Sequence, residues 1–170
     1  MEDHSVLRNV ACPADARWAA LFDVWAVAGA LALGALVRIP LPFSPVPLTL
    51  QTFVVLVAAF AVGERRAGAG TTLYLALGWY GVPLFAVSSG ATMGYLLAFV
   101  AVPFVVTRFR NTALALLAAT LLIYGLGAGW LCLGLGLAPW QAVVTGVAPF
   151  LVGDALKAAA AYRLIRWMQG

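Results

Sequence analysis

The sequence has little charge and few groups suited to chemistry in water. Charged residues make up 9% of its 170 residues, against roughly a quarter in soluble domains. There is one histidine, there are two cysteines far apart in sequence (Cys12 and Cys132), and there is no phosphate-binding Gly-x-x-x-x-Gly-Lys-Ser/Thr motif. These absences argue against a disulfide framework, a histidine-based triad, a metal centre and an ATP-binding P-loop. The net charge of +4 does not indicate nucleic acid either, because the basic residues are scattered at the ends of apolar runs.

What the chain has in abundance is apolar sequence, at 64% of residues and a mean hydropathy of +1.00. So few polar residues cannot cover a water-facing surface, so most of the chain is expected to lie in a bilayer as helices. We predict a single all-α integral membrane domain over residues 1–170, with a polar cytoplasmic tail at residues 1–17. Six membrane spans are predicted at residues 18–37, 48–62, 69–83, 91–107, 112–132 and from about 149 to 167. Pro103 is expected to kink the fourth, and a short extra helix at residues 140–147 precedes the sixth.

The distribution of Lys and Arg predicts the orientation of these spans. With the amino terminus inside, eight arginines fall on the inner side, and Arg38 alone falls in an outer loop. This bias follows the positive-inside rule and predicts that both termini are cytoplasmic. We therefore expect a multi-pass protein of a bacterial or archaeal cytoplasmic membrane.

The segment at residues 38–51 carries four prolines and cannot form an ordinary helix. We predict an extended, stiff loop on the outer side. Because a stiff loop has little entropy to lose when it orders, it suits a lid over a binding site. The alternative is a rigid connector between two spans.

Asp154 and Lys157 are the two charges that stay inside the apolar spans once the orienting charges are set aside. They are three residues apart, so they share one helix face and can pair. Burying a charge in a membrane costs about 2.5–3.5 kcal/mol on insertion scales, which favours a functional role over a packing ion pair. Other polar and aromatic groups at the outer helix ends would complete a mostly apolar small-molecule pocket. The candidate site residues are Arg38, Phe43, Thr49, Gln51, Tyr74, Phe85, Tyr95, Asp154 and Lys157, with Thr92 also weighed.

Four motifs give the sequence a resemblance to the BioY family, the biotin-binding S components of energy-coupling-factor (ECF) transporters. They are Arg38-Ile-Pro-Leu-Pro-Phe with Pro45-Val-Pro-Leu-Thr-Leu-Gln51, Tyr74-Leu-Ala-Leu-Gly-Trp-Tyr-Gly-Val-Pro83-Leu-Phe-Ala86, Gly90-Ala-Thr-Met-Gly-Tyr95 and Pro149-Phe-Leu-Val-Gly-Asp154-Ala-Leu-Lys157. The sequence departs from the family pattern before Gly90. A longer glycine-rich loop is absent there, and Ala91 and Met93 replace a proline and a glycine.

The resemblance implies a six-helix S-component bundle that captures biotin and docks on a transmembrane coupling subunit driven by two ATPase subunits. Biotin is then the transported ligand, and no cofactor is expected. The docking contact is expected on the first helix, at Ala26 with Ala30 or at Ala28 with Ala32, and the sequence does not choose between these pairs. Other readings are an S component for another vitamin, a structural subunit, or a membrane-embedded lipid-acting enzyme using Asp154 or Lys157.

Overall fold

The computed structural model describes residues 13–82 and 90–170, with side chains from residue 16 onward. The elements are helices apart from one small hairpin. In chain order they are α1 (Pro13–Leu36), β1 (Arg38–Ile39), β2 (Leu48–Thr49), α2 (Gln51–Val62), α3 (Glu64–Trp79), α4 (Met93–Val106), α5 (Thr112–Leu135), α6 (Pro139–Gly146), the 3-10 turn η2 (Ala148–Phe150) and α7 (Leu151–Gln169). The predicted all-helical bundle is therefore confirmed in its main features.

Helix length and hydropathy identify several membrane-crossing candidates in the described part of the chain. Three runs are long and apolar enough to cross a bilayer: Ala16–Leu36, Thr112–Leu135 and Pro139–Gln169. Gln51–Val62 and Met93–Val106 are apolar but shorter. The predicted short helix is present as α6, which begins with Pro139 in its first turn. Pro149 lies in the 3-10 turn that separates α6 from α7.

Several helix boundaries differ from the prediction. α1 begins at Pro13, inside the predicted tail, α2 begins at Gln51 instead of residue 48, and α3 ends at Trp79 instead of residue 83. Glu64, Arg65 and Arg66 form the first turn of α3 instead of a separate charged turn before residue 69. The reversal needs a single residue, because Gly63 adopts a φ of 83°, which a side chain would disfavour. The fourth helix begins at Met93, two residues later than expected, and continues through Pro103.

A further correction concerns a charged residue in α1. Asp23 also lies inside the predicted first span, so the prediction that Asp154 and Lys157 are the two charges within the spans is wrong. Its Oδ2 accepts a hydrogen bond from Arg66 Nη1 at 2.6 Å, which joins α1 to the start of α3. A nearby polar contact joins α3 to α4, where Thr107 Oγ1 donates to Glu64 Oε2 at 2.6 Å.

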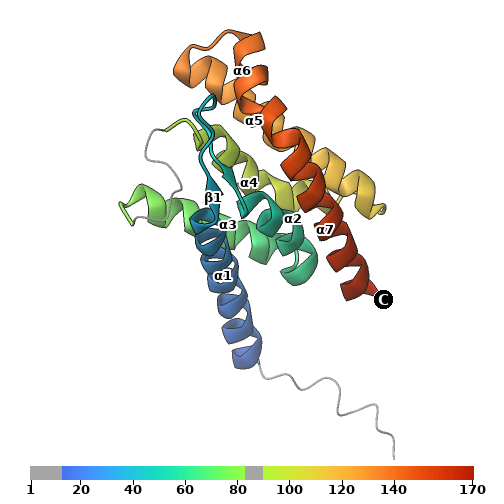
Figure 1. Cartoon of the computed structure of the whole chain (residues 1–170). Coiled ribbons are helices and arrows are strands. Elements are labelled where there is room, and N and C mark those ends of the chain that lie inside the picture. The colour runs from blue at the N-terminus through green and yellow to red at the C-terminus, as the bar shows by residue number, and fades with distance from the viewer. Residues whose placement is uncertain (1–12, 83–89) are drawn as a thin grey trace, which may run out of the picture.

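The proline-rich segment folds as a β-hairpin, which the sequence analysis did not predict. Arg38 pairs with Thr49 and Ile39 with Leu48, in antiparallel register. The turn between them contains the prolines, where no ladder hydrogen bond is required of them. In Figure 1 the hairpin and α6 lie at one end of the bundle, and α1 begins and α7 ends toward the other.

Helix α2 occupies the centre of the bundle and contacts α1, α3, α4 and α7. Val55 and Leu56, in its middle, are fully buried. Its first residues, Gln51 and Thr52, are also buried although they are polar. Because the start of α2 points toward the hairpin end, this arrangement gathers polar groups there beneath the hairpin (Figure 1).

Candidate functional site

A cavity lies between the hairpin, α2, α4, α5 and α7, and contains about 540 Å³ of space, open solvent at its mouth included. Most of its walls are apolar or aromatic, with a few polar groups among them. The lining residues are Val46, Pro47, Thr49, Gln51, Thr52, Thr92, Tyr95, Leu96, Phe99, Ile123, Tyr124, Phe150, Asp154 and Lys157.

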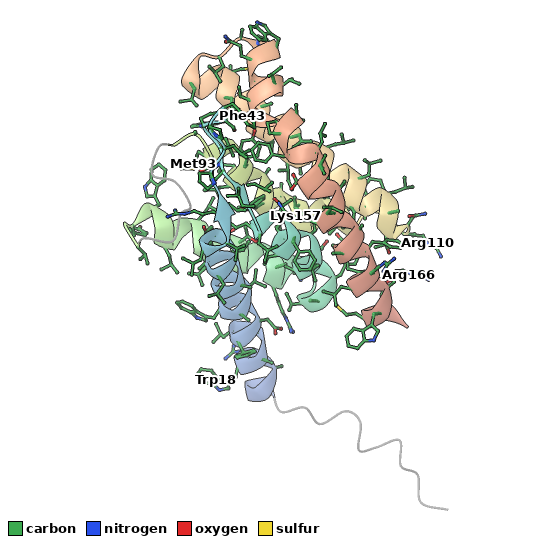
Figure 2. The ribbon with its side chains drawn as sticks, viewed as in Figure 1. Trp18, Phe43, Met93, Arg110, Lys157 and Arg166 are labelled. Carbon is green, nitrogen blue, oxygen red and sulfur yellow. The ribbon has the colours of Figure 1, made fainter. Side chains whose placement is uncertain are left out.

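The charged part of the cavity is a three-residue network on α5 and α7. Lys157 Nζ donates to Asp154 Oδ1 at 2.8 Å, and Tyr124 Oη donates to Asp154 Oδ2 at 2.9 Å. The side chains of Asp154 and Lys157 are 7% and 12% exposed. Figure 2 shows Lys157 directed from α7 into the bundle. Each carboxylate oxygen has a second lone pair and the ammonium has further donors, so the network can still bind a polar ligand.

A second polar chain starts at the beginning of α2. Gln51 Nε2 donates to Tyr74 Oη at 2.7 Å, and the two residues are buried. Thr49 Oγ1 lies 3.4 Å from Gln51 Oε1, at the limit of a weak hydrogen bond. Tyr74 does not line the cavity; it holds the Gln51 amide from behind, which fixes the side chain that does.

Tyr95 lies on α4 and connects this part of the cavity wall to α5 and α6. Its hydroxyl donates to the carbonyl of Gly146 at 2.6 Å, at the end of α6. Its ring lies against Gly127 of α5, where a Cβ atom would collide with it. Tyr95 is therefore held by packing and by its own hydrogen bond, and it offers the cavity mainly an aromatic surface.

The hairpin covers the cavity through its second half. Val46 and Pro47 line the cavity, and Val46 is 5% exposed. Ser44 Oγ donates to Thr145 O of α6 at 2.6 Å and accepts from the Val46 N–H at 3.1 Å. These bonds fasten the hairpin to α6 at the point where it passes over the cavity.

The structure brings together five of the predicted site residues: Thr49, Gln51, Tyr95, Asp154 and Lys157. Tyr74 supports them from behind. Arg38 and Phe43 do not line the cavity.

Arg38 is exposed on β1, and Phe43 is 62% exposed in the hairpin turn, at the position labelled in Figure 2. Phe85 lies outside the described residues.

Three further residues line the cavity but were not predicted from the sequence: Tyr124, Thr52 and Phe150. Tyr124 is the most informative omission, because it binds the buried carboxylate directly. A tyrosine in the middle of the apolar run Thr112–Leu135 was the available signal, since a hydroxyl at membrane depth needs a partner. Among the described residues, no group of three or more His, Cys, Asp or Glu side chains is placed to hold a metal ion.

Burial separates the two alanine pairs on α1. Ala28 is 4% exposed and Ala32 packs against the core, whereas Ala26 is exposed and Ala30 is half-buried. Gly29 is also exposed, with open space around it. A surface of small residues is therefore available on α1 at Ala26 and Ala30.

Comparison with known proteins gives a family for this chain. The sequence profile of the BioY family matches residues 9–169. The chain is 35% identical over 142 residues to a probable biotin transporter BioY of Pyrococcus horikoshii, covering 78% of this chain and 86% of that protein. It is 34% identical over 154 residues to the biotin transporter BioY of Rhodobacter capsulatus, covering 75% and 80% of the two chains.

The fold is also similar to that of a solved structure, described as the S-component for biotin from an ECF-type ABC transporter. The TM-score is 0.79, and the match covers 91% of this chain and 93% of the other at 21% identity. The apolar helices and these relatives fit a multi-pass membrane protein of a prokaryote. The chain belongs to the BioY family.

Proposed function

We propose that this chain binds biotin in the cavity beneath the hairpin and delivers it for uptake as the substrate-binding subunit of an ECF-type transporter. The observation that carries the proposal is the buried Asp154–Lys157 pair, which opens onto an otherwise mainly apolar cavity in a member of the BioY family. A buried charge pair is poorly explained by stability alone. The names of the relatives support biotin as the ligand.

Biotin offers groups that match the polar residues of this cavity. Its ureido ring has two N–H donors, for which Asp154 is an acceptor, and its carboxylate suits the Lys157 ammonium. The aromatic surfaces of Tyr95, Phe99 and Phe150 suit its thioether ring and aliphatic chain. We infer that the ligand joins the existing network instead of meeting isolated charges, since Tyr124 and Lys157 already hold both carboxylate oxygens.

Six spans are proposed for the bundle: α1, α2, α3, α4, α5 and α7, with α6 as a short outer helix. The hairpin then lies on the outer side, and both termini are cytoplasmic. The distribution of the described arginines supports this orientation, because from Arg17 onward they lie at the helix ends away from the hairpin, except for Arg38. A reporter fused to the carboxyl terminus should give a cytoplasmic signal; an external signal would contradict the six-span arrangement.

The partners proposed are a transmembrane coupling subunit and two ATPase subunits. Ala26 and Ala30 are the favoured docking pair, because Ala28 is already buried within the chain. Small residues at this spacing allow close approach of a partner helix in lipid. Ala26→Trp should reduce uptake in cells carrying the whole transporter and leave biotin binding by the isolated chain intact; reduced binding would place Ala26 in the fold instead.

The proposed pose is tested by combining variants with ligand analogues. Biotin affinity is measured for the wild type and Lys157→Met, first with biotin and then with its methyl ester, which lacks the carboxylate charge. The substitution should weaken biotin by about 1.5–3 kcal/mol, the worth of a charged hydrogen bond, and weaken the ester much less. Equal losses for both ligands would contradict contact between Lys157 and the carboxylate. If Asp154→Asn also left biotin affinity unchanged, the whole arrangement would be wrong.

A further inference from the structure

A second hollow, distinct from the covered cavity, runs between α5 and α7 on the outside of the bundle. It contains about 1000 Å³, open space at its mouth included, and its surface is almost entirely apolar. Leu116, Leu117 and Leu121 line it from α5, and Leu151, Ala155 and Ala158 line it from α7. We refer to it as the α5–α7 groove. Because its walls are apolar, the part of the groove that faces the membrane is expected to hold an apolar group.

At one end the groove runs into a polar pocket. This pocket is lined by Arg110, Asn111, Thr112, Tyr162, Arg166 and Gln169, and it shares Tyr162 with the groove. Figure 2 shows Arg110 and Arg166 approaching each other at this end, from the start of α5 and the end of α7. The pocket therefore presents two positive charges beside a long apolar channel.

Neither arginine is neutralised within the described part of the chain. The two salt bridges there are Asp23–Arg66 and Asp154–Lys157, and the pocket lining contains no acidic residue. The Asn111 side chain is already engaged, because its Oδ1 caps the amides of Ala113 and Leu114. The pair Arg110 and Arg166 is thus available to an anion.

The length of the groove matches one lipid leaflet. From Ala113 to Tyr124 it follows α5 for about 16 Å, at 1.5 Å per residue. That is about half of the roughly 30 Å hydrocarbon core. A transmembrane partner helix would need a groove of about twice this length, whereas one acyl chain from the arginine end would fill this one.

We propose that the α5–α7 groove and the pocket of Arg110 and Arg166 form a binding site for one anionic phospholipid. The headgroup phosphate lies between the two arginines, and one acyl chain follows the groove as far as Tyr124 and Asp154. Both of these residues also line the covered cavity. The lipid chain therefore packs against the back of the wall that holds the buried carboxylate.

The proposal is tested by native mass spectrometry of the purified chain in detergent, titrated with phosphatidylglycerol or phosphatidylcholine. The wild type should bind phosphatidylglycerol preferentially. The double variant Arg110→Gln/Arg166→Gln should bind it about 30-fold more weakly, since each basic residue near an anionic lipid surface contributes about fivefold. The matched control is Arg108→Gln/Arg163→Gln, which removes the same charge from the same two segments but from residues that line neither space. The control should bind like the wild type.

A second variant tests the acyl-chain part of the site with both arginines in place. Ala155→Phe adds a ring to the groove, where Ala155 is exposed, and should also weaken phosphatidylglycerol binding. The proposal is overturned by equal loss in the charge control, by equal binding of phosphatidylcholine, or by unchanged binding in Ala155→Phe. Competition by soluble glycerol phosphate would indicate a free-anion site. Disulfide-linked dimers of an Ala155→Cys variant would indicate a second copy, and either result would contradict a lipid.

Discussion

The two ion pairs among the described residues have similar geometry and different surroundings. Asp23 and Arg66 lie 2.6 Å apart with side chains 24% and 45% exposed, whereas Asp154 and Lys157 lie 2.8 Å apart at 7% and 12%. An exposed pair is screened and contributes about 0–1 kcal/mol. A buried pair offsets a desolvation cost of several kcal/mol per ion, so replacing it with apolar residues would often be neutral or stabilising. The presence of the buried pair Asp154–Lys157 beside a cavity therefore points to ligand binding. The exposed pair Asp23–Arg66 joins α1 to α3 instead.

The largest expected effect is that of breaking the buried pair, Asp154 and Lys157. Asp154→Asn keeps the shape of the side chain but leaves Lys157 without its counter-charge. We expect a loss of about 3–5 kcal/mol in the free energy of unfolding, because an uncompensated charge then stays buried. Reversible unfolding in detergent measures it. A loss no larger than that of Asp23→Asn would show that burial makes no difference between the two pairs.

Removing the hydroxyl of Tyr124, which donates to the Asp154 carboxylate, should have a smaller effect on the free energy of unfolding. Tyr124→Phe deletes one hydrogen bond to a charged group, worth about 1.5–3 kcal/mol, and leaves the ring in place. The matched control is Tyr162→Phe, on the exposed side of α7, which should change the unfolding free energy very little. The same unfolding measurement applies. Equal effects of the two substitutions would remove Tyr124 from the network.

The hairpin covers the cavity that contains the buried pair, and it does not cover the exposed pair. Replacing Pro42 and Pro45 together by glycine loosens the turn at about 0.4–1 kcal/mol per position. Biotin dissociation, followed by stopped-flow, should then be about fourfold to 30-fold faster, and the free energy of unfolding should fall by about 0.8–2 kcal/mol for the two positions together. An unchanged dissociation rate would reduce the hairpin to a connector.

The smallest expected effect on stability is that of breaking the exposed pair, Asp23 and Arg66. Asp23→Asn should cost at most about 1 kcal/mol of unfolding free energy, and less at high salt, since exposed charges are screened. Biotin affinity should not change, because Asp23 is remote from the cavity lining. A change in biotin affinity in this variant would show that the exposed pair is coupled to the cavity. It would contradict the assignment of ligand binding to the buried pair alone.

Local sequence features allowed much of the bundle and part of the site to be predicted. Proline positions located α6 and the break before α7, because proline fits the first turn of a helix but removes a backbone hydrogen bond in its interior. Pro103 is the exception, since α4 continues through it. The spacing of Asp154 and Lys157 gave their pairing, since helical geometry alone brings residues three apart together. These predictions required no knowledge of tertiary contacts.

The features that were missed depend on contacts between distant residues. The turn of the hairpin places Val46 and Pro47 in the cavity lining and leaves Phe43 exposed. The turn is fastened to α6 by the hydrogen bond from Ser44 to the carbonyl of Thr145, which is 101 residues away in sequence. Tyr124 is 30 residues from Asp154. Only helix packing shows that the two meet.

The most direct test of the account is equilibrium binding of radiolabelled biotin to the purified chain in detergent, with Asp154→Asn and Asp23→Asn beside the wild type. We expect saturable one-to-one binding to the wild type and to Asp23→Asn at concentrations below about 1 μM, and much weaker binding to Asp154→Asn. Absence of binding to the wild type at micromolar biotin would contradict the account.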